Sequence, residues 1–142
     1  MSENKKLKEL FDSHKKYISQ IKQLDNRMDE LTPYEIAKLE YLYTKAERIA
    51  WQITGEYKRE YKYYEGMAEV AQGQEYKNIR ENKKKTATDG QYMSRITKGE
   101  MLMEAANYEG DYMSWKGIAG TYERAANALK DIMKSISVQG GA

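Results

Sequence analysis

Tyrosines interleaved with lysines and arginines are the residues of this sequence with the clearest capacity for binding chemistry. They gather in the segment 56–66 and continue into a basic stretch that follows it. Cations neutralise phosphates, and aromatic rings stack on bases at roughly 1–3 kcal/mol per base, so this mixture suits single-stranded nucleic acid. The same spacing also suits a buried face, because tyrosines three and four residues apart share one side of a helix. The predicted nucleic-acid-binding residues are Lys58, Arg59, Lys62, Tyr61, Tyr63, Tyr64, Lys83, Lys84 and Lys85.

Catalysis and metal binding, by contrast, lack suitable residues. His14 is the only histidine and there is no cysteine, so a transition-metal site is not expected. A Ser/His/Asp arrangement would have to recruit that one histidine, which we interpret as a core-facing side chain with a local hydrogen bond. Glu56 and Glu60 are better explained as ion-pair partners of neighbouring lysines and arginines. We therefore predict no enzymatic activity, no catalytic or metal-binding residue and no cofactor.

The composition indicates which elements must position these side chains. Of 142 residues, 32% are charged, one is proline and one is phenylalanine, which favours long helices over sheets. The net charge of +2 provides no general attraction for nucleic acid, so any basic site must be local. No apolar stretch approaches the roughly 20 residues of a membrane span, and the lack of cysteine suits a reducing compartment. We expect a soluble cytoplasmic protein.

Heptad spacing of apolar residues predicts the first two helices. Residues 5–31 carry apolar side chains mostly at alternating steps of three and four, which predicts one helix over that range. Thr32-Pro33-Tyr34-Glu35 then forms a capping-box signature, so a second helix is expected over residues 33–79. Residues 80–90 lack apolar spacing and predict a basic loop closed by an Asp89-Gly90 turn.

A third helix is predicted over residues 92–136, followed by a frayed tail at 137–142. Gly110, Gly117 and Gly120 indicate either close backbone approach or a kink. The expected fold is all-α: a single helical domain over residues 1–142, in which a helical hairpin and a long C-terminal helix carry coiled-coil-like seams and assemble into a homo-oligomer. The predicted oligomer interface comprises Tyr108, Tyr112, Trp115, Tyr122, Leu129 and Met133.

The segment from Lys58 to Gly66 resembles a short signature of the UvsY-type phage recombination mediators, in which a basic helix ends in a Tyr-Tyr-x-Gly element. As in that family, a basic loop and a long C-terminal helix follow, and the overall length is similar. The likeness covers residues 34–136 as architecture and only the surroundings of the motif as residues. Lys58 matches the family's first basic position, whereas Glu60 stands at the second, so Arg59 and Lys62 would take that role.

The resemblance implies a small helical protein that assembles into a ring-like oligomer and binds single-stranded DNA. Such a mediator helps to load a phage recombinase onto strands covered by single-strand-binding protein, so a recombinase and that protein are the implied partners. The residues alone leave a second hypothesis open: a helical structural or scaffold protein, for example a phage particle component, that self-assembles without binding DNA. No membrane partner is expected in either case, and a phage-encoded protein would act in the host cytoplasm.

Overall fold

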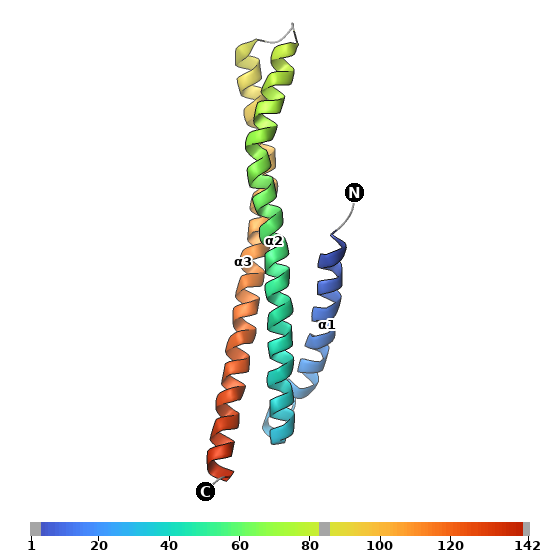
Figure 1. Cartoon of the computed structure of the whole chain (residues 1–142), viewed down its shortest axis with the longest axis vertical. Helices are drawn as coiled ribbons and strands as arrows, with labels where there is room; N and C mark the ends of the chain where they lie inside the picture. The colour runs from blue at the N-terminus through green and yellow to red at the C-terminus, as the bar shows by residue number, and fades with distance from the viewer. Residues whose placement is uncertain (1–3, 83–85, 141–142) are drawn as a thin grey trace. The chain divides into compact units, whose positions relative to one another are not determined.

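The computed structural model describes residues 4–82 and 86–140, and within these ranges the chain is almost entirely helical, with no strand. Helix α1 spans Lys5–Asp25, the short 3-10 helix η1 spans Met28–Glu30, α2 spans Pro33–Glu81 and α3 spans Ala87–Gly140 (Figure 1). The predicted all-α fold class is therefore confirmed for the described chain.

The helices contribute to two compact units. The first unit comprises Met1–Thr54 and Met113–Ala142, and the second comprises Gly55–Tyr112. Helix α2 therefore gives its beginning to the first unit and its remainder to the second, whereas α3 does the reverse. The single domain expected from the sequence is thus organised as two compact groups of contacts.

Helix α1 is shorter than the predicted range of residues 5–31. It begins after Asn4, whose side-chain Oδ1 accepts a hydrogen bond from the Leu7 backbone N–H at 3.0 Å. It ends at Asp25, and residues 26–31 form a turn and η1 instead. A helix continuing to Leu31 would leave only Thr32 to reverse the chain direction before Pro33, so the connection requires these residues.

The start of α2 has the capping box that the sequence predicts. The Glu35 backbone N–H donates to Thr32 Oγ1, and the Thr32 backbone N–H donates to Glu35 Oε1, both at 3.2 Å. The Arg27 guanidinium donates to Glu35 Oε2 at 2.8 Å. The hydrogen bond from Arg27 lowers the pKa of the partly buried Glu35 carboxyl most, and the hydrogen bond from the Thr32 backbone lowers it further.

Aliphatic side chains from all three long helices form the core of the first unit. Leu39 and Ile53 on α2 are completely buried. Figure 1 shows α1 folded back along the beginning of α2, and Ile21 of α1 and Ile36 of α2 belong to the same buried cluster. Full burial of such a side chain contributes about 1.5–3 kcal/mol, so this cluster holds the helices of the unit together. The buried cluster consists of Ile21, Ile36, Leu39, Leu42, Ala46 and Leu129.

The second unit pairs the later part of α2 with the beginning of α3. Helix α3 starts at Ala87, earlier than the predicted residue 92, and α2 continues to Glu81, so the predicted loop at residues 80–90 is too long. The Asp89 backbone N–H donates to Thr86 Oγ1 and the Thr86 backbone N–H to Asp89 Oδ2, both at 3.1 Å. Asp89 therefore belongs to a helix-starting cap and not to the predicted Asp-Gly turn.

Gly90 lies in the first turn of α3 and is buried. A Cβ at this position would lie 3.2 Å from two ring carbons of Tyr76, so the glycine allows the tyrosine ring to approach the α3 backbone. This close approach explains a residue that the sequence presents as a turn former.

The remaining glycines of α3 have a different environment. A Cβ built at Gly110 or Gly117 meets no atom within 4 Å, and one at Gly120 meets only the Arg124 guanidinium. Helix α3 continues through all three positions, so close approach by the described residues does not account for them. Helix α3 also continues to Gly140, so residues 137–140 of the predicted frayed tail are helical.

Candidate single-stranded nucleic-acid interface

Four of the predicted DNA-binding residues form an exposed patch on α2 in the second unit. Lys58, Arg59, Lys62 and Tyr63 occupy adjacent positions on two successive helical turns, and all four are exposed. The ring of Tyr63 is 59% exposed, so most of its surface is free to contact a ligand. We call these four residues the basic patch.

Tyr61 and Tyr64 lie on the opposite side of the same helix, where they pack against α3. Tyr61 is only 9% exposed, and its ring centroid lies 5.6 Å from that of Tyr112. Tyr64 stacks on Tyr108 with centroids 5.4 Å apart and rings 9° from parallel. In this structure Tyr61 has no free ring face, because the packing between α2 and α3 uses it.

Tyr57 continues this inner row, with its centroid 6.4 Å from that of Tyr108. Burial is the main cause that raises the pKa of both hydroxyls, with smaller contributions from Asp111 and other nearby groups. These tyrosines therefore stay neutral in ordinary buffers and act as packing groups with a polar edge.

The cations of the basic patch make weak contacts that leave their charge available. Lys58 Nζ lies 5.9 Å from the ring centroid of Tyr112, and Lys62 Nζ lies 5.1 Å from that of Tyr61. Lys62 also forms an exposed ion pair with Glu65 at 3.3 Å. The hydrogen bonds to Glu65 and then to Tyr61 raise the pKa of the Lys62 amine, which keeps it protonated.

Arg59 forms an ion pair with a buried acidic side chain. Its Nη1 lies 3.2 Å from Glu56 Oε1, and the Glu56 side chain is 6% exposed whereas that of Arg59 is 72% exposed. The guanidinium thus compensates a buried carboxylate while most of its own surface faces solvent. Lys83, Lys84 and Lys85, the other predicted DNA-binding residues, lie outside the described residues.

The predicted oligomer interface is occupied by contacts inside each unit. In the second unit, Tyr108 and Tyr112 pack on the tyrosines of α2. In the first unit, Leu129 is 5% exposed in the aliphatic core. Tyr122 and Met133 pack against that core, and Trp115 contacts the rings of Phe11 and His14. The seam is present on α3, but its partners here are other helices of the same chain.

His14 has a hydrogen-bond partner, but this partner lies on α3 and is not local in the sequence. Its Nε2 lies 2.7 Å from the Tyr122 hydroxyl oxygen, and its ring meets Trp115 edge-on with centroids 4.9 Å apart. Burial lowers the pKa of the imidazole, which favours its neutral form. The histidine is therefore a packing residue of the first unit.

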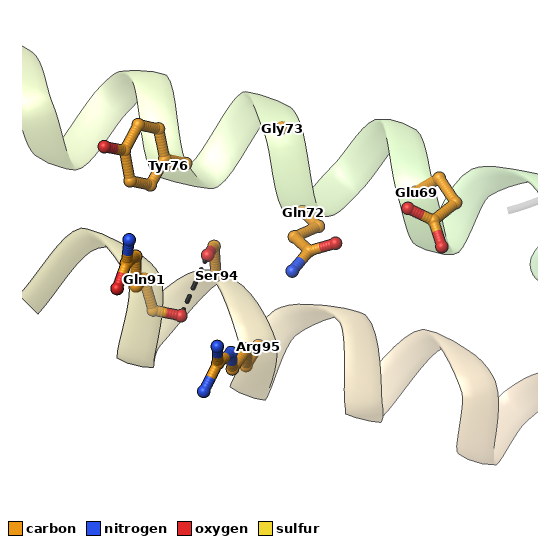
Figure 2. Close-up of a pocket in the computed structure, with 7 residues that line it drawn as sticks. All are labelled: Glu69, Gln72, Gly73, Tyr76, Gln91, Ser94 and Arg95. Carbon is orange, nitrogen blue, oxygen red and sulfur yellow. Dashed lines mark hydrogen bonds between the residues drawn. The ribbon is translucent and has the colours of Figure 1, made fainter. Parts of the chain in front are cut away.

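A polar cleft of about 400 Å³, which the sequence did not indicate, lies between α2 and α3 in the second unit. Figure 2 shows Gln72 and Tyr76 of α2 facing Gln91 and Ser94 of α3, and the Ser94 hydroxyl donates to the backbone carbonyl oxygen of Gln91 at 3.0 Å. The lining residues are Glu69, Gln72, Gly73, Tyr76, Gln91, Ser94 and Arg95.

Among the described residues, no group of three or more acidic, histidine or cysteine side chains is arranged to hold a metal ion. Likewise, none of the described helices combines the length and apolar character needed to cross a membrane.

Comparisons of the chain with models of protein families, with curated proteins and with solved structures find no match. The resemblance to UvsY-type mediators stays a prediction that rests on the motif and its surroundings.

Proposed function

We propose that this protein binds single-stranded DNA through the basic patch and, as a homo-oligomer, helps to load a phage recombinase onto DNA. The observation that supports the proposal is the division of α2 into two sides. Tyr57, Tyr61 and Tyr64 pack against α3, whereas the three cations and Tyr63 face solvent side by side. The inner tyrosines hold the helix, and the outer side is left for a ligand.

The chemistry of the basic patch suits a strand with accessible bases. Three cations within two helical turns match a run of phosphates, and Tyr63 offers one stacking surface worth roughly 1–3 kcal/mol. Each exposed ion pair that a phosphate must replace, such as Lys62 with Glu65, is worth only about 0–1 kcal/mol. Phosphates can therefore compete for these cations.

One such patch binds weakly, so the proposal requires several copies on one strand. Linking sites in an oligomer raises the effective concentration of each further site and can increase avidity by roughly 100- to 10,000-fold. This requirement is why a mediator of this kind acts as an oligomer, with a recombinase and a single-strand-binding protein as its proposed partners.

The test compares two charge-matched double variants. Lys58→Gln with Lys62→Gln removes two patch cations but keeps the Arg59–Glu56 ion pair, which protects the fold. Lys15→Gln with Lys16→Gln removes two exposed cations of α1 as the control. Binding to a labelled oligothymidylate is measured by fluorescence anisotropy at several salt concentrations, and helicity by circular dichroism.

We expect the patch variant to bind at least about tenfold more weakly than wild type. The slope of the logarithm of the binding constant against the logarithm of the salt concentration should become shallower by about 1.4, or about 0.7 for each lost phosphate contact. The control should bind within about twofold of wild type. Equal binding by the patch variant and the control would contradict the assignment of the patch.

A scaffold protein that self-assembles without DNA is the second candidate. It is favoured by exposed apolar side chains on α3, such as Tyr92 at 67% and Met103 at 70% exposure. Under this alternative, wild type itself shows no salt-sensitive oligonucleotide binding.

A further inference from the structure

Helix α3 carries a second apolar row in the second unit, separate from the one that packs on α2. Its members recur at steps of four, three, four, three and four residues, which is the spacing of a coiled-coil seam. Tyr92, Ile96 and Met103 in this row are 67%, 46% and 70% exposed. We call this row the outer seam, and it consists of Tyr92, Ile96, Gly99, Met103, Ala106 and Gly110.

The outer seam and the inner row lie on opposite sides of the helix. The inner side, represented by Ala105 and Tyr108, faces α2 in the second unit. On the outer side, a Cβ at Gly99 or Gly110 meets no atom within 4 Å. The described chain therefore places nothing against these glycines, although each lowers the helix propensity of α3 by about 1 kcal/mol relative to alanine.

The order of large and small residues along the outer seam identifies its partner. If a second copy of the helix runs antiparallel about a two-fold axis at residue 101, every layer joins a large side chain to a small one. Tyr92 then faces Gly110 of the second copy, Ile96 faces Ala106, and Gly99 faces Met103. Each bulky side chain fills the space that a small residue leaves. A parallel, in-register pair would instead place like on like and leave a void at each glycine.

The flanking residues agree with the same antiparallel register. Arg95 lies beside Glu109 of the second copy, and the two-fold axis repeats this opposite-charge pair. Leu102, which is 41% exposed in the single chain, meets its own counterpart near the axis. Glu100 also approaches its counterpart, and this like-charge contact opposes the pairing. Two attractive ion pairs and an apolar contact stand against that one repulsion.

We propose that two copies of this chain pair antiparallel through the outer seam of α3. Such a pair supplies an oligomer of the kind that the proposed function requires, but it rests on the seam and not on DNA binding. The open glycines then have a role, since they receive side chains of the second copy.

The first experiment measures mass in solution without DNA, so that its result is independent of the basic patch. Wild type should sediment at twice the 16.6 kDa chain mass or a multiple of that. Met103→Glu places a carboxylate in the seam and should raise the dimer dissociation constant at least tenfold. Val70→Glu, at a 58% exposed position on α2, makes the same kind of change away from the seam and should leave the mass unchanged.

Cysteine crosslinking tests the register, because the chain has no cysteine of its own. Under mild oxidation, Leu102→Cys should form a disulfide-linked dimer, because residue 102 meets its counterpart near the axis. Tyr92→Cys should not crosslink to itself, because it faces residue 110 of the second copy. A parallel pair would reverse this pattern.

Crosslinking of Tyr92→Cys and not of Leu102→Cys would overturn the proposal. A monomeric wild-type mass across the concentration range would also overturn it, as would equal masses for Met103→Glu and wild type. Circular dichroism on each variant verifies that these exposed substitutions leave the helices intact.

Discussion

The two units of this protein use different side chains to hold helices together. In the first unit, aliphatic residues such as Leu39 and Ile53 are fully buried. In the second, tyrosines such as Tyr61 and Tyr64 join α2 to α3, and several of their rings stay partly exposed. An aliphatic core excludes water completely, whereas a tyrosine keeps its hydroxyl at the edge of the packing. The second unit therefore combines helix packing with a polar surface directly beside it.

This difference separates stability from binding. Removal of an aliphatic side chain in the first unit should affect only stability. In the second unit, inner and outer residues of one helix should affect different properties. The two tryptophans, Trp51 and Trp115, both belong to the first unit, so their fluorescence reports its unfolding, while circular dichroism reports all helices.

The largest effect is expected from Leu39→Ala. Leu39 is completely buried in the cluster that joins the three helices of the first unit. Its truncation should lower the free energy of unfolding by about 3–5 kcal/mol, from lost burial and the cavity left behind. Urea denaturation, monitored by tryptophan fluorescence, measures this loss in the free energy of unfolding. Tyr34→Ala, at a 75% exposed position, is the control and should change the value by less than about 0.5 kcal/mol. A loss for Leu39→Ala as small as the change expected for the control would contradict the role of Leu39 in the stabilising core.

A second pair of variants divides the tyrosines of α2. Tyr61→Ala should lower stability by about 2–3 kcal/mol, because the ring is buried against Tyr112. Tyr63→Ala should leave the circular dichroism melt nearly unchanged but weaken oligothymidylate binding by about 1–3 kcal/mol, the value of one stacked base. Loss of stability in Tyr63→Ala without loss of binding would remove the distinction between the inner and outer sides.

Much of this arrangement is predictable from spacing and caps. The heptad pattern predicts long helices, and Thr32 with Glu35 predicts the start of α2, because capping requires local residue types only. The spacing of Tyr57, Tyr61 and Tyr64 likewise predicts a shared helical face. The identity of the partner that meets this face depends on tertiary structure. Consequently the sequence left base stacking and burial both open for Tyr61.

Other features depend on context that a local pattern lacks. Asp89-Gly90 is a turn signal as well as the end of a Thr-x-x-Asp cap, and only the position of Tyr76 explains why glycine follows the cap. Leu129 and Tyr112 have the spacing of an intermolecular seam, but other helices of the same chain already pack against these residues. A heptad pattern indicates that a partner exists without naming it.

The pH dependence of the first unit should follow His14. Burial lowers the pKa of its imidazole in the folded state below the value of about 6.5 in the unfolded chain. Protons then bind more readily to the unfolded state, so stability is fully present above about pH 6.5 and falls as the pH drops toward the folded pKa. Urea midpoints from pH 7.5 to 5, read by tryptophan fluorescence, measure the trend. His14→Gln keeps a polar partner for Tyr122 and should make the urea midpoint nearly independent of pH over this range. An equally steep decline in that variant would assign the dependence to other groups.

The smallest effect compares one substitution at two glycines of the second unit. Gly66→Ala should raise the free energy of unfolding by up to about 1 kcal/mol, because alanine has the higher helix propensity and its Cβ meets nothing within 4 Å. Gly90→Ala gains the same propensity, but its Cβ would lie 3.2 Å from the Tyr76 ring, so the ring must shift. We expect the two changes to have opposite signs in urea melts followed by circular dichroism. Tyr76→Ala removes the ring, so in that background Gly90→Ala should raise the free energy of unfolding relative to Tyr76→Ala alone. If Gly90→Ala alone stabilises as much as Gly66→Ala, then the close approach of Tyr76 does not constrain the start of α3.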